Sequence, residues 1–215
     1  MTSSRTLFCG ALIAMLLLSP GNATHAFQRQ DLPFFSCSTF PSNESESDLV
    51  TRFGAANVTT ALIEGGGAEG EMNPGTLLFA DRGDSRMEIF WKDKDLKRRP
   101  DWIHVYGGRS QWRSPAGITL GTDLRTLEKL NGRAFRLLGF GVDDEGGVVT
   151  WVGGKLVDDA TPGCKFKIYL SPRSTDSATG RIEKEVLGDR EYSSGHPAMQ
   201  QLNPQVYQMF LLYGE

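Results

Sequence analysis

Two histidines are the candidate acid–base groups of the chain beyond its N-terminal segment, His104 and His196. A histidine can activate a serine nucleophile, and Ser193 and Ser194 come just before His196. Short runs of serine, glycine and proline are more typical of turns, and the G-x-S-x-G signature of a nucleophile elbow does not occur. A hydrolase that uses His196 or His104 therefore stays open as an alternative, and we assign no catalytic residue.

Metal and phosphate sites need residue groupings that this sequence does not contain. Neither H-E-x-x-H nor a cluster of cysteines and histidines occurs, so we expect no zinc site. The acidic run 143–145 lacks the alternating ligands of a calcium-binding EF-hand loop. Glycines 65–67 are not followed by the Lys-Ser or Lys-Thr of a phosphate-binding loop. The sequence thus predicts no metal and no cofactor.

Aromatic residues alternate along one short stretch of high β-propensity. Trp102, His104 and Tyr106 occupy every second position there, so a strand would place all three side chains on one face. Because large alternating aromatics usually face the core, we expect Trp102 and Tyr106 to be buried.

The loop that follows this stretch contains the candidate binding residues. Arg109, Trp112 and Arg113 lie in a segment of glycine, serine and proline that cannot form regular structure. Tryptophan and arginine are the residue types most enriched at binding hot spots. Two interpretations are equally consistent with the sequence, since Trp112 can reach outward to a partner or fold back as an anchor of its loop.

The first 26 residues are typical of a secretory signal peptide. Arg5 provides a positive N-terminal region, 7–18 is an uncharged apolar stretch, and 19–21 breaks it before small residues. We expect cleavage after Ala26, with Ala23 as the alternative site. The apolar stretch is shorter than the roughly 20 residues of a membrane span, so the sequence predicts an exported chain, periplasmic or secreted, with no membrane span.

Cysteine usage agrees with export. Cys9 would leave with the signal peptide, so that Cys37 and Cys164 remain. An even pair in an oxidising compartment predicts one disulfide, and two separate buried thiols are the alternative. C-x-x-C does not occur, which argues against a thioredoxin-like redox site.

Net charge bears on the class of partner. The formal charge of −3 becomes −4 when the signal peptide removes one arginine, Arg5, and no acidic residue. This mild acidity gives no electrostatic footprint for nucleic acid. Net charge therefore argues against nucleic acid as the partner, and the tryptophan and arginines of the candidate binding loop favour another protein.

Three short helices are predicted by their caps and by apolar periodicity. Ser45 and Asp48 have the spacing of a capping box at the start of a helix over 45–53. A second helix has Thr122 as its expected N-cap, and leucines recur at every third position until Asn131-Gly132 ends it. A third helix is expected over 197–202.

Short strands fill most of the remaining chain, with a loop over 65–75 and hairpins at 81–85 and 143–147. The strand over 164–170 alternates polar and apolar residues and so has one wet face, which predicts an antiparallel sheet. The predicted fold is a single α+β domain over 27–215, an antiparallel sheet with a few short helices on one face, built from two loosely repeated helix-plus-strands units. The expected strands are 57–64, 76–80, 86–92, 101–106, 134–140, 148–152, 164–170 and 206–213.

The second unit carries a family resemblance. Gly117-Ile118-x-x-Gly121, the leucine-periodic helix, Asn131-Gly132 and an aromatic strand resemble the repeat of small exported domains of the SmpA/OmlA type. The same fold family is thought to include protein inhibitors of β-lactamase. Members commonly have proline after the helix, where this chain has Ala134. The resemblance implies contact with another protein through an exposed sheet face, and no catalysis.

From these observations we expect an exported, non-catalytic protein-binding or inhibitor-like module. The alternatives are the small secreted hydrolase described above and a structural component of the cell envelope.

Overall fold

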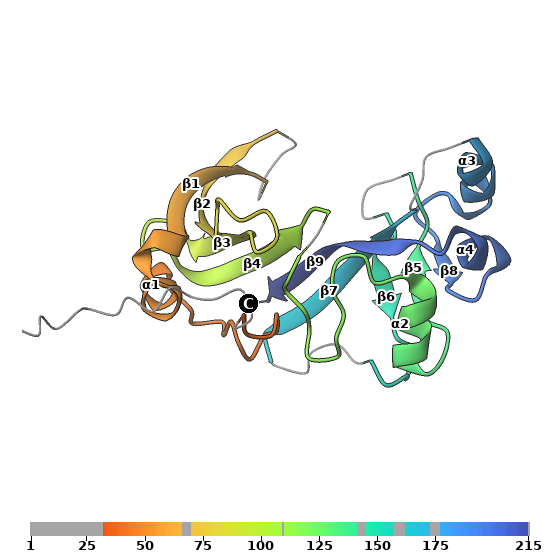
Figure 1. The fold of residues 1–215 in the computed structure, drawn as a ribbon, viewed down its shortest axis with the longest axis horizontal. Coiled ribbons are helices and arrows are strands. Elements are labelled where there is room, and N and C mark those ends of the chain that lie inside the picture. The colour runs from red at the N-terminus through yellow and green to blue at the C-terminus, as the bar shows by residue number, and fades with distance from the viewer. Residues whose placement is uncertain are drawn as a thin grey trace, which may run out of the picture.

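The computed structural model describes residues 32–65, 70–108, 110–141, 145–156, 162–172 and 177–214. Within these ranges the chain forms a six-stranded and a three-stranded antiparallel sheet and four short α-helices, as the predicted α+β class requires (Figure 1). The predicted signal peptide, residues 1–26, lies outside the described residues.

The larger sheet forms the body of the molecule. Its strand order is β1-β2-β3-β4-β9-β7, and every neighbouring pair is antiparallel. The first four strands follow one another as hairpins, whereas the C-terminal strand inserts between β4 and β7 (Figure 1). The bounds are β1 Val58–Glu64, β2 Met72–Leu78, β3 Met87–Asp93, β4 Arg98–Tyr106, β7 Cys164–Ser171 and β9 Gln205–Tyr213.

Helix α1 (Glu46–Phe53) begins at the predicted capping box. The Ser45 side chain accepts from the Asp48 backbone N–H, and the Asp48 carboxylate accepts from the Ser45 N–H at 3.0 Å. These bonds satisfy backbone donors that the first helical turn leaves free. The helix buries Leu49 and Phe53 and is followed by a short 3-10 turn, η1 (Ala55–Asn57).

Helix α2 (Leu124–Asn131) begins one residue later than the sequence predicts. Asp123 is the N-cap, and its carboxylate accepts from the Thr126 N–H at 2.8 Å. The Thr122 hydroxyl instead accepts from the Thr119 N–H, so Thr122 stabilises the preceding turn. Gly132 closes the helix in the left-handed conformation, and the predicted apolar face is buried at Leu127.

The smaller sheet lies beside the helices of the C-terminal part. Its order is β6-β5-β8, and Gly147 forms an isolated bridge to Tyr169 that joins it to the larger sheet. Strand β8 and helix α3 were not predicted, whereas the predicted helix α4 has the expected bounds. The elements are β5 Arg136–Leu138, β6 Val148–Thr150, β8 Glu191–Ser193, α3 Ser177–Glu183, the 3-10 turn η2 Lys184–Val186, and α4 Pro197–Leu202.

Two prolines lie inside strands that were expected to start after them. Pro74 pairs with Leu62 of β1 at a place where β3 no longer runs alongside β2. Pro100 faces Trp91 at a β-bulge, before β9 begins to pair with β4 at Trp102. Neither proline has a second strand of the sheet paired opposite it, as is usual for proline in sheets.

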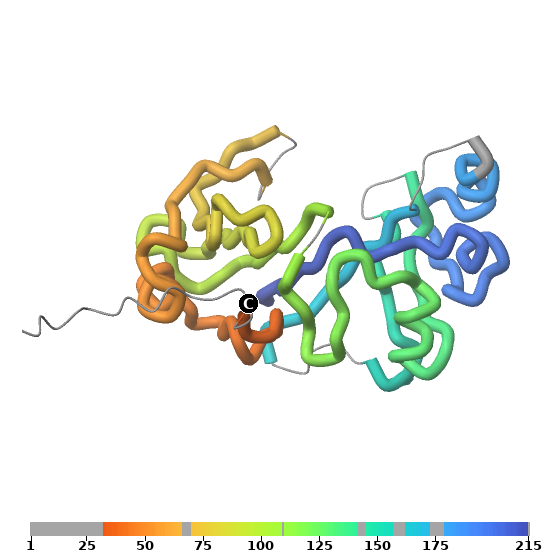
Figure 2. The backbone as a smooth tube through the Cα atoms, in the orientation of Figure 1, coloured from red at the N-terminus to blue at the C-terminus, as the bar shows by residue number. Residues whose placement is uncertain are grey.

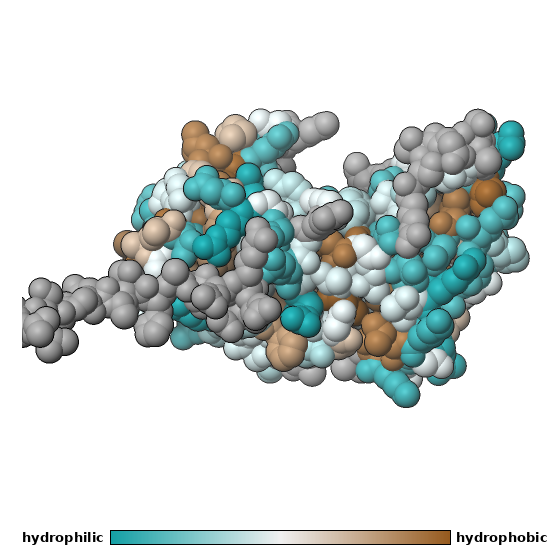
Figure 3. All heavy atoms as spheres, in the orientation of Figure 1, coloured by the Kyte–Doolittle hydropathy of each residue, from teal (hydrophilic) through white to brown (hydrophobic). Residues whose placement is uncertain are grey.

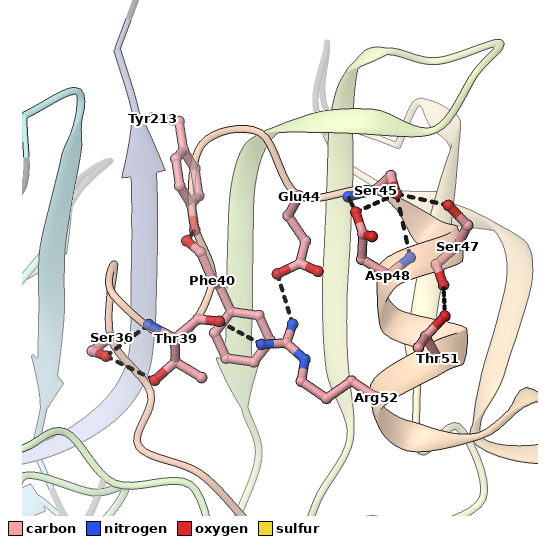
Figure 4. Close-up of polar contacts among 10 residues, drawn as sticks. All are labelled: Ser36, Thr39, Phe40, Glu44, Ser45, Ser47, Asp48, Thr51, Arg52 and Tyr213. Carbon is pink, nitrogen blue, oxygen red and sulfur yellow. Dashed lines mark hydrogen bonds and ion pairs between the residues drawn. The ribbon is translucent and has the colours of Figure 1, made fainter.

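The N-terminal segment is fastened to the β7–β9 side of the large sheet and to α1. The sulfurs of Cys37 and Cys164 lie 2.08 Å apart, which is the predicted disulfide. The Tyr213 hydroxyl donates to the Phe40 carbonyl at 2.6 Å, and Arg52 of α1 donates to the Glu44 carboxylate at 2.6 Å (Figure 4). The tube view shows this segment passing close to the end of β9 (Figure 2).

One buried cluster extends through both sheets. It includes Leu49 of α1, Ile103 of β4, Leu127 of α2 and Leu137 of β5, all of them inaccessible to solvent. The N-terminal segment and α1 therefore cover one face of the large sheet.

Candidate functional site: an open aromatic face on the large sheet

The opposite face of the large sheet presents a group of aromatic side chains. In the antiparallel register, Trp102 and His104 of β4 lie opposite Leu212 and Phe210 of β9. Strand β7 flanks β9 on its other edge, where Lys167 lies opposite Phe210. Residues directly opposite one another share a face of a sheet. We call this surface the aromatic face; its members are Trp102, His104 and Tyr106 of β4, Phe210 and Leu212 of β9, and Tyr169 of β7.

The rings of this face are packed against one another. The centroids of His104 and Phe210 lie 4.1 Å apart with nearly parallel planes, and those of His104 and Tyr106 lie 4.6 Å apart. Trp102 stacks on Phe90 of β3 at 3.8 Å. Aromatic pairs at these separations contribute about 0.5–1.5 kcal/mol beyond the area they bury. Their mutual contacts hold the rings in fixed positions on a rigid sheet.

The aromatic face is open to solvent. Tyr106 is 40% exposed, and Trp102 and Phe210 are half-buried. The described helices pack elsewhere, α1 on β1 and both α2 and α3 on α4. In the space-filling view the outline is hollowed between the β1–β2 hairpin and the part that contains α3 (Figure 3). The expectation that Trp102 and Tyr106 face the core is therefore wrong, because the aliphatic residues between them do so.

A buried carboxylate connects the polar groups of this face. Glu88 of β3 is 4% exposed and accepts from the Tyr106 hydroxyl at 2.9 Å and from the Arg86 guanidinium at 3.0 Å. Its other oxygen lies 3.7 Å from Nδ1 of His104, which is an electrostatic contact and too long for a hydrogen bond. These contacts fix the orientation of the Tyr106 ring.

Burial and pairing act on the protonation states of this cluster. Burial lowers the pKa of His104, and the nearby Glu88 carboxylate offsets only part of that effect. Burial raises the pKa of Glu88, but the interactions with His104, Tyr106 and Arg86 lower it more, so that the net pKa is below its ordinary value. The interactions with His104, Tyr106 and Arg86 together therefore favour the ionised form of Glu88.

Trp112 does not lie on this surface. Its side chain is inaccessible to solvent, it lies among the rings of Phe40, Phe53 and Phe79, and its indole N–H donates to the Ser85 carbonyl at 2.7 Å. The expectation of an outward contact is corrected: Trp112 is the loop anchor, because a pocket of aromatic rings and a carbonyl acceptor satisfies both parts of the indole.

Arg109 and Arg113 were predicted as binding residues together with Trp112. Arg113 is exposed, and its backbone carbonyl accepts from the Phe35 N–H. Arg109 lies outside the described residues. The structure therefore does not place Trp112 and Arg113 on one exposed surface. The aromatic face, whose residues Trp102 and Tyr106 the sequence assigned to the core, is the larger candidate.

The two histidines are far apart in the architecture. His196 is the N-cap of α4, and its Nδ1 accepts from the Ala198 N–H at 3.2 Å. His104 has an Nε2 atom that is inaccessible to solvent and has no hydrogen-bond partner among the described residues. The buried Nε2 of His104 cannot reach a substrate proton in this conformation. Among the described residues, neither imidazole forms a hydrogen bond with a serine hydroxyl, the contact that a serine-activating base makes.

Comparisons with protein-family models, with curated proteins and with solved structures find no match to this chain. Among the described residues, none of the helices has both the length and the apolar character needed to cross a membrane.

Proposed function

We propose that the chain is an exported protein-binding module whose contact surface is the aromatic face. The observation that supports this is an ordered group of half-exposed aromatic rings on a sheet face that none of the described helices covers. Large rigid aromatics contribute most of the free energy at protein interfaces, because they bury apolar area at little entropic cost. This is also the mode of contact that the resemblance to SmpA/OmlA-type domains implies.

Charge favours an acidic partner surface. The cations Arg86, Lys165 and Lys167 lie along this face, and Lys167 lies over the Tyr169 ring at 4.7 Å. Glu88, the carboxylate among them, is already engaged by Arg86 and Tyr106. The face is therefore apolar at its centre with positive charge at its margins, which complements apolar side chains surrounded by aspartate or glutamate.

The disulfide supports export, since such bonds persist in oxidising compartments. The hydrolase alternative has less support, because Nε2 of His104 is buried and His196 is used as a helix cap. A purely structural envelope role offers no reason for an open aromatic surface.

Site-specific photocrosslinking tests the proposal. A benzoylphenylalanine introduced at Tyr169 or Phe210 should give a discrete adduct with one acidic protein of the exporting cell after irradiation. The matched control is the same residue at Leu96, a 62% exposed apolar position in the β3–β4 turn. Adducts from Leu96 alone, or none from the aromatic face, would contradict the proposed contact surface.

A further inference from the structure

A second candidate site lies on the covered side of the large sheet. It is a cavity of about 270 Å³ between the N-terminal segment, the loop 114–118, the turn 151–156 and β7. Phe166 of β7 contributes to its wall, and the strand alternation that turns Phe166 this way turns Lys165 and Lys167 to the aromatic face. The cavity and the aromatic face are therefore separate sites on opposite sides of one sheet.

The lining of this cavity is apolar with a small polar part. Its apolar walls come from Phe35, Ile118, Trp151, Leu156 and Phe166, and hydroxyl groups come from Ser36, Ser38 and Ser114. Among the described lining residues Lys155 is the one ionisable side chain. Its ammonium group makes no hydrogen bond or ion pair with any residue that the structure describes. This composition is typical of ligand pockets, which combine apolar walls with a few polar groups that orient the ligand.

The cavity walls are held in place before any ligand binds. The buried amide of Asn131 donates to the Trp151 carbonyl at 3.0 Å and accepts from the Leu156 N–H at 3.1 Å, which fixes the turn that carries Lys155. The Lys155 N–H donates to the Asn131 backbone carbonyl at 2.7 Å. On the other side, the Cys37–Cys164 disulfide ties the serine-bearing segment to β7.

The turn 151–156 also contains a residue with a strained backbone. Val152 has a φ of 55°, a left-handed conformation that a β-branched residue rarely adopts, and its side chain is 41% exposed. Such strain persists only where the surrounding structure imposes it, and it is concentrated at ligand sites. The side chain of Asn131 holds the chain on either side of Val152, at Trp151 and at Leu156.

Cavity size and charge define the ligand. Cavities of about 150 Å³ lined by aliphatic and aromatic side chains take up a benzene ring. The volume here has room for a larger apolar group, such as two fused rings or a short alkyl chain. We propose that this cavity binds a small amphipathic carboxylate, with the apolar body against Phe35, Trp151 and Phe166 and the carboxylate toward Lys155 and the serine hydroxyls.

The direct test uses 2-naphthoate and its uncharged analogue 2-naphthylmethanol as probes, measured by isothermal titration calorimetry on the exported chain. The carboxylate should bind, and the alcohol should bind about fivefold more weakly because it lacks the ion pair with Lys155. Lys155→Gln should abolish that fivefold preference and leave the affinity for the alcohol unchanged.

A second variant locates the bound probe. Ala116 is an exposed residue of the cavity wall, so Ala116→Trp should fill the cavity without unfolding the chain, which a thermal melt can check. We expect no binding of either probe to this variant. Binding that survives Ala116→Trp, equal affinity of the wild type for both probes, or no binding at millimolar concentration would each overturn the proposal.

These outcomes are independent of the proposed protein contact. Lys155 and Ala116 lie on the covered side of the sheet, so neither variant should change photocrosslinking from Tyr169 or Phe210. If Ala116→Trp abolishes the crosslink and the naphthyl probes do not bind, the cavity receives a side chain of the partner protein and the ligand proposal is wrong.

Discussion

Two tryptophans ten positions apart have opposite environments in this molecule. Trp102 lies half-buried on the open face of the large sheet, stacked on Phe90, whereas Trp112 is inaccessible on the covered side among three phenylalanines. Local sequence predicts a buried Trp102 in a strand and leaves the orientation of Trp112, in a glycine-rich loop, open. The comparison shows that a loop can supply the core and a strand can supply the surface for recognition.

The physical reason lies in what each face of the sheet packs against. On the covered side, the N-terminal segment and α1 bring Phe40 and Phe53 over the sheet, and Trp112 completes that cluster. On the open side the rings pack on their neighbours along the same sheet. The covered side should therefore determine stability and the open side binding.

Trp112→Ala should have the largest effect on stability. Removing a buried indole leaves a cavity and an unpaired Ser85 carbonyl, so we expect a loss of about 3–5 kcal/mol in the free energy of unfolding. Chemical denaturation of the variant beside the wild type measures it. A loss of only a few tenths would show that the indole is not an anchor.

Loss of the disulfide should come next. Cys37 and Cys164 are 127 residues apart in sequence, and opening so long a loop should cost about 2–4 kcal/mol through the entropy of the unfolded chain. The double variant Cys37→Ser, Cys164→Ser can be compared with the wild type by thermal melting under non-reducing conditions. Equal melting temperatures, or labelling of both native thiols, would contradict a stabilising bond.

Phe210→Ala tests whether the open face of the sheet binds the partner. We expect partner affinity to fall by on the order of 2 kcal/mol, about 30-fold, as for a central aromatic of an interface. The matched control Leu96→Ala removes a more exposed apolar side chain from the β3–β4 turn and should leave affinity unchanged. Titration of the crosslinked partner, once purified, against both variants measures the difference. Equal losses of affinity in Phe210→Ala and Leu96→Ala would contradict a binding role that is specific to the aromatic face.

The pH dependence of stability should be the smallest effect. Burial lowers the pKa of His104, so the unfolded chain takes up a proton at a higher pH than the folded chain. Stability should therefore fall as the pH drops below the unfolded value of about 6.5 toward the folded pKa. Glu88, whose pKa is also lowered, contributes its own loss at more acidic pH.

The variant His104→Phe keeps the aromatic stack and removes the titrating group. Denaturation at pH 7 and pH 5.5 should then show a smaller decrease in stability than in the wild type. An identical decrease in both would mean that His104 does not cause it.

Helix ends were predictable because their signals are local. The capping box at Ser45, the closing glycine at Gly132 and the last helix follow from residues within one turn of each end. Helix α3 was not predicted, since Gly180 and small polar residues give it low intrinsic helix propensity and it depends on packing against α4.

The orientation of the open face could not be predicted from alternation. A period of two correctly groups Trp102, His104 and Tyr106, but it does not say which face of a strand is covered. The aliphatic Ile103 and Val105 are the core side here, because the N-terminal segment and α1 pack there. In β9 apolar residues lie on both faces, so the sequence did not indicate that Phe210 belongs to the open face. Tertiary packing also determined the position of Trp112, since the rings around it belong to Phe40, Phe53 and Phe79, which are distant in sequence.

Hydroxyl-radical footprinting of the chain with and without its partner tests the central claim most directly. If the aromatic face is the contact surface, binding should strongly reduce labelling of Trp102, Tyr106 and Tyr169 and leave labelling of Leu96 unchanged. Unchanged labelling of those three aromatic residues, with protection confined to the loop around Arg113, would contradict the account.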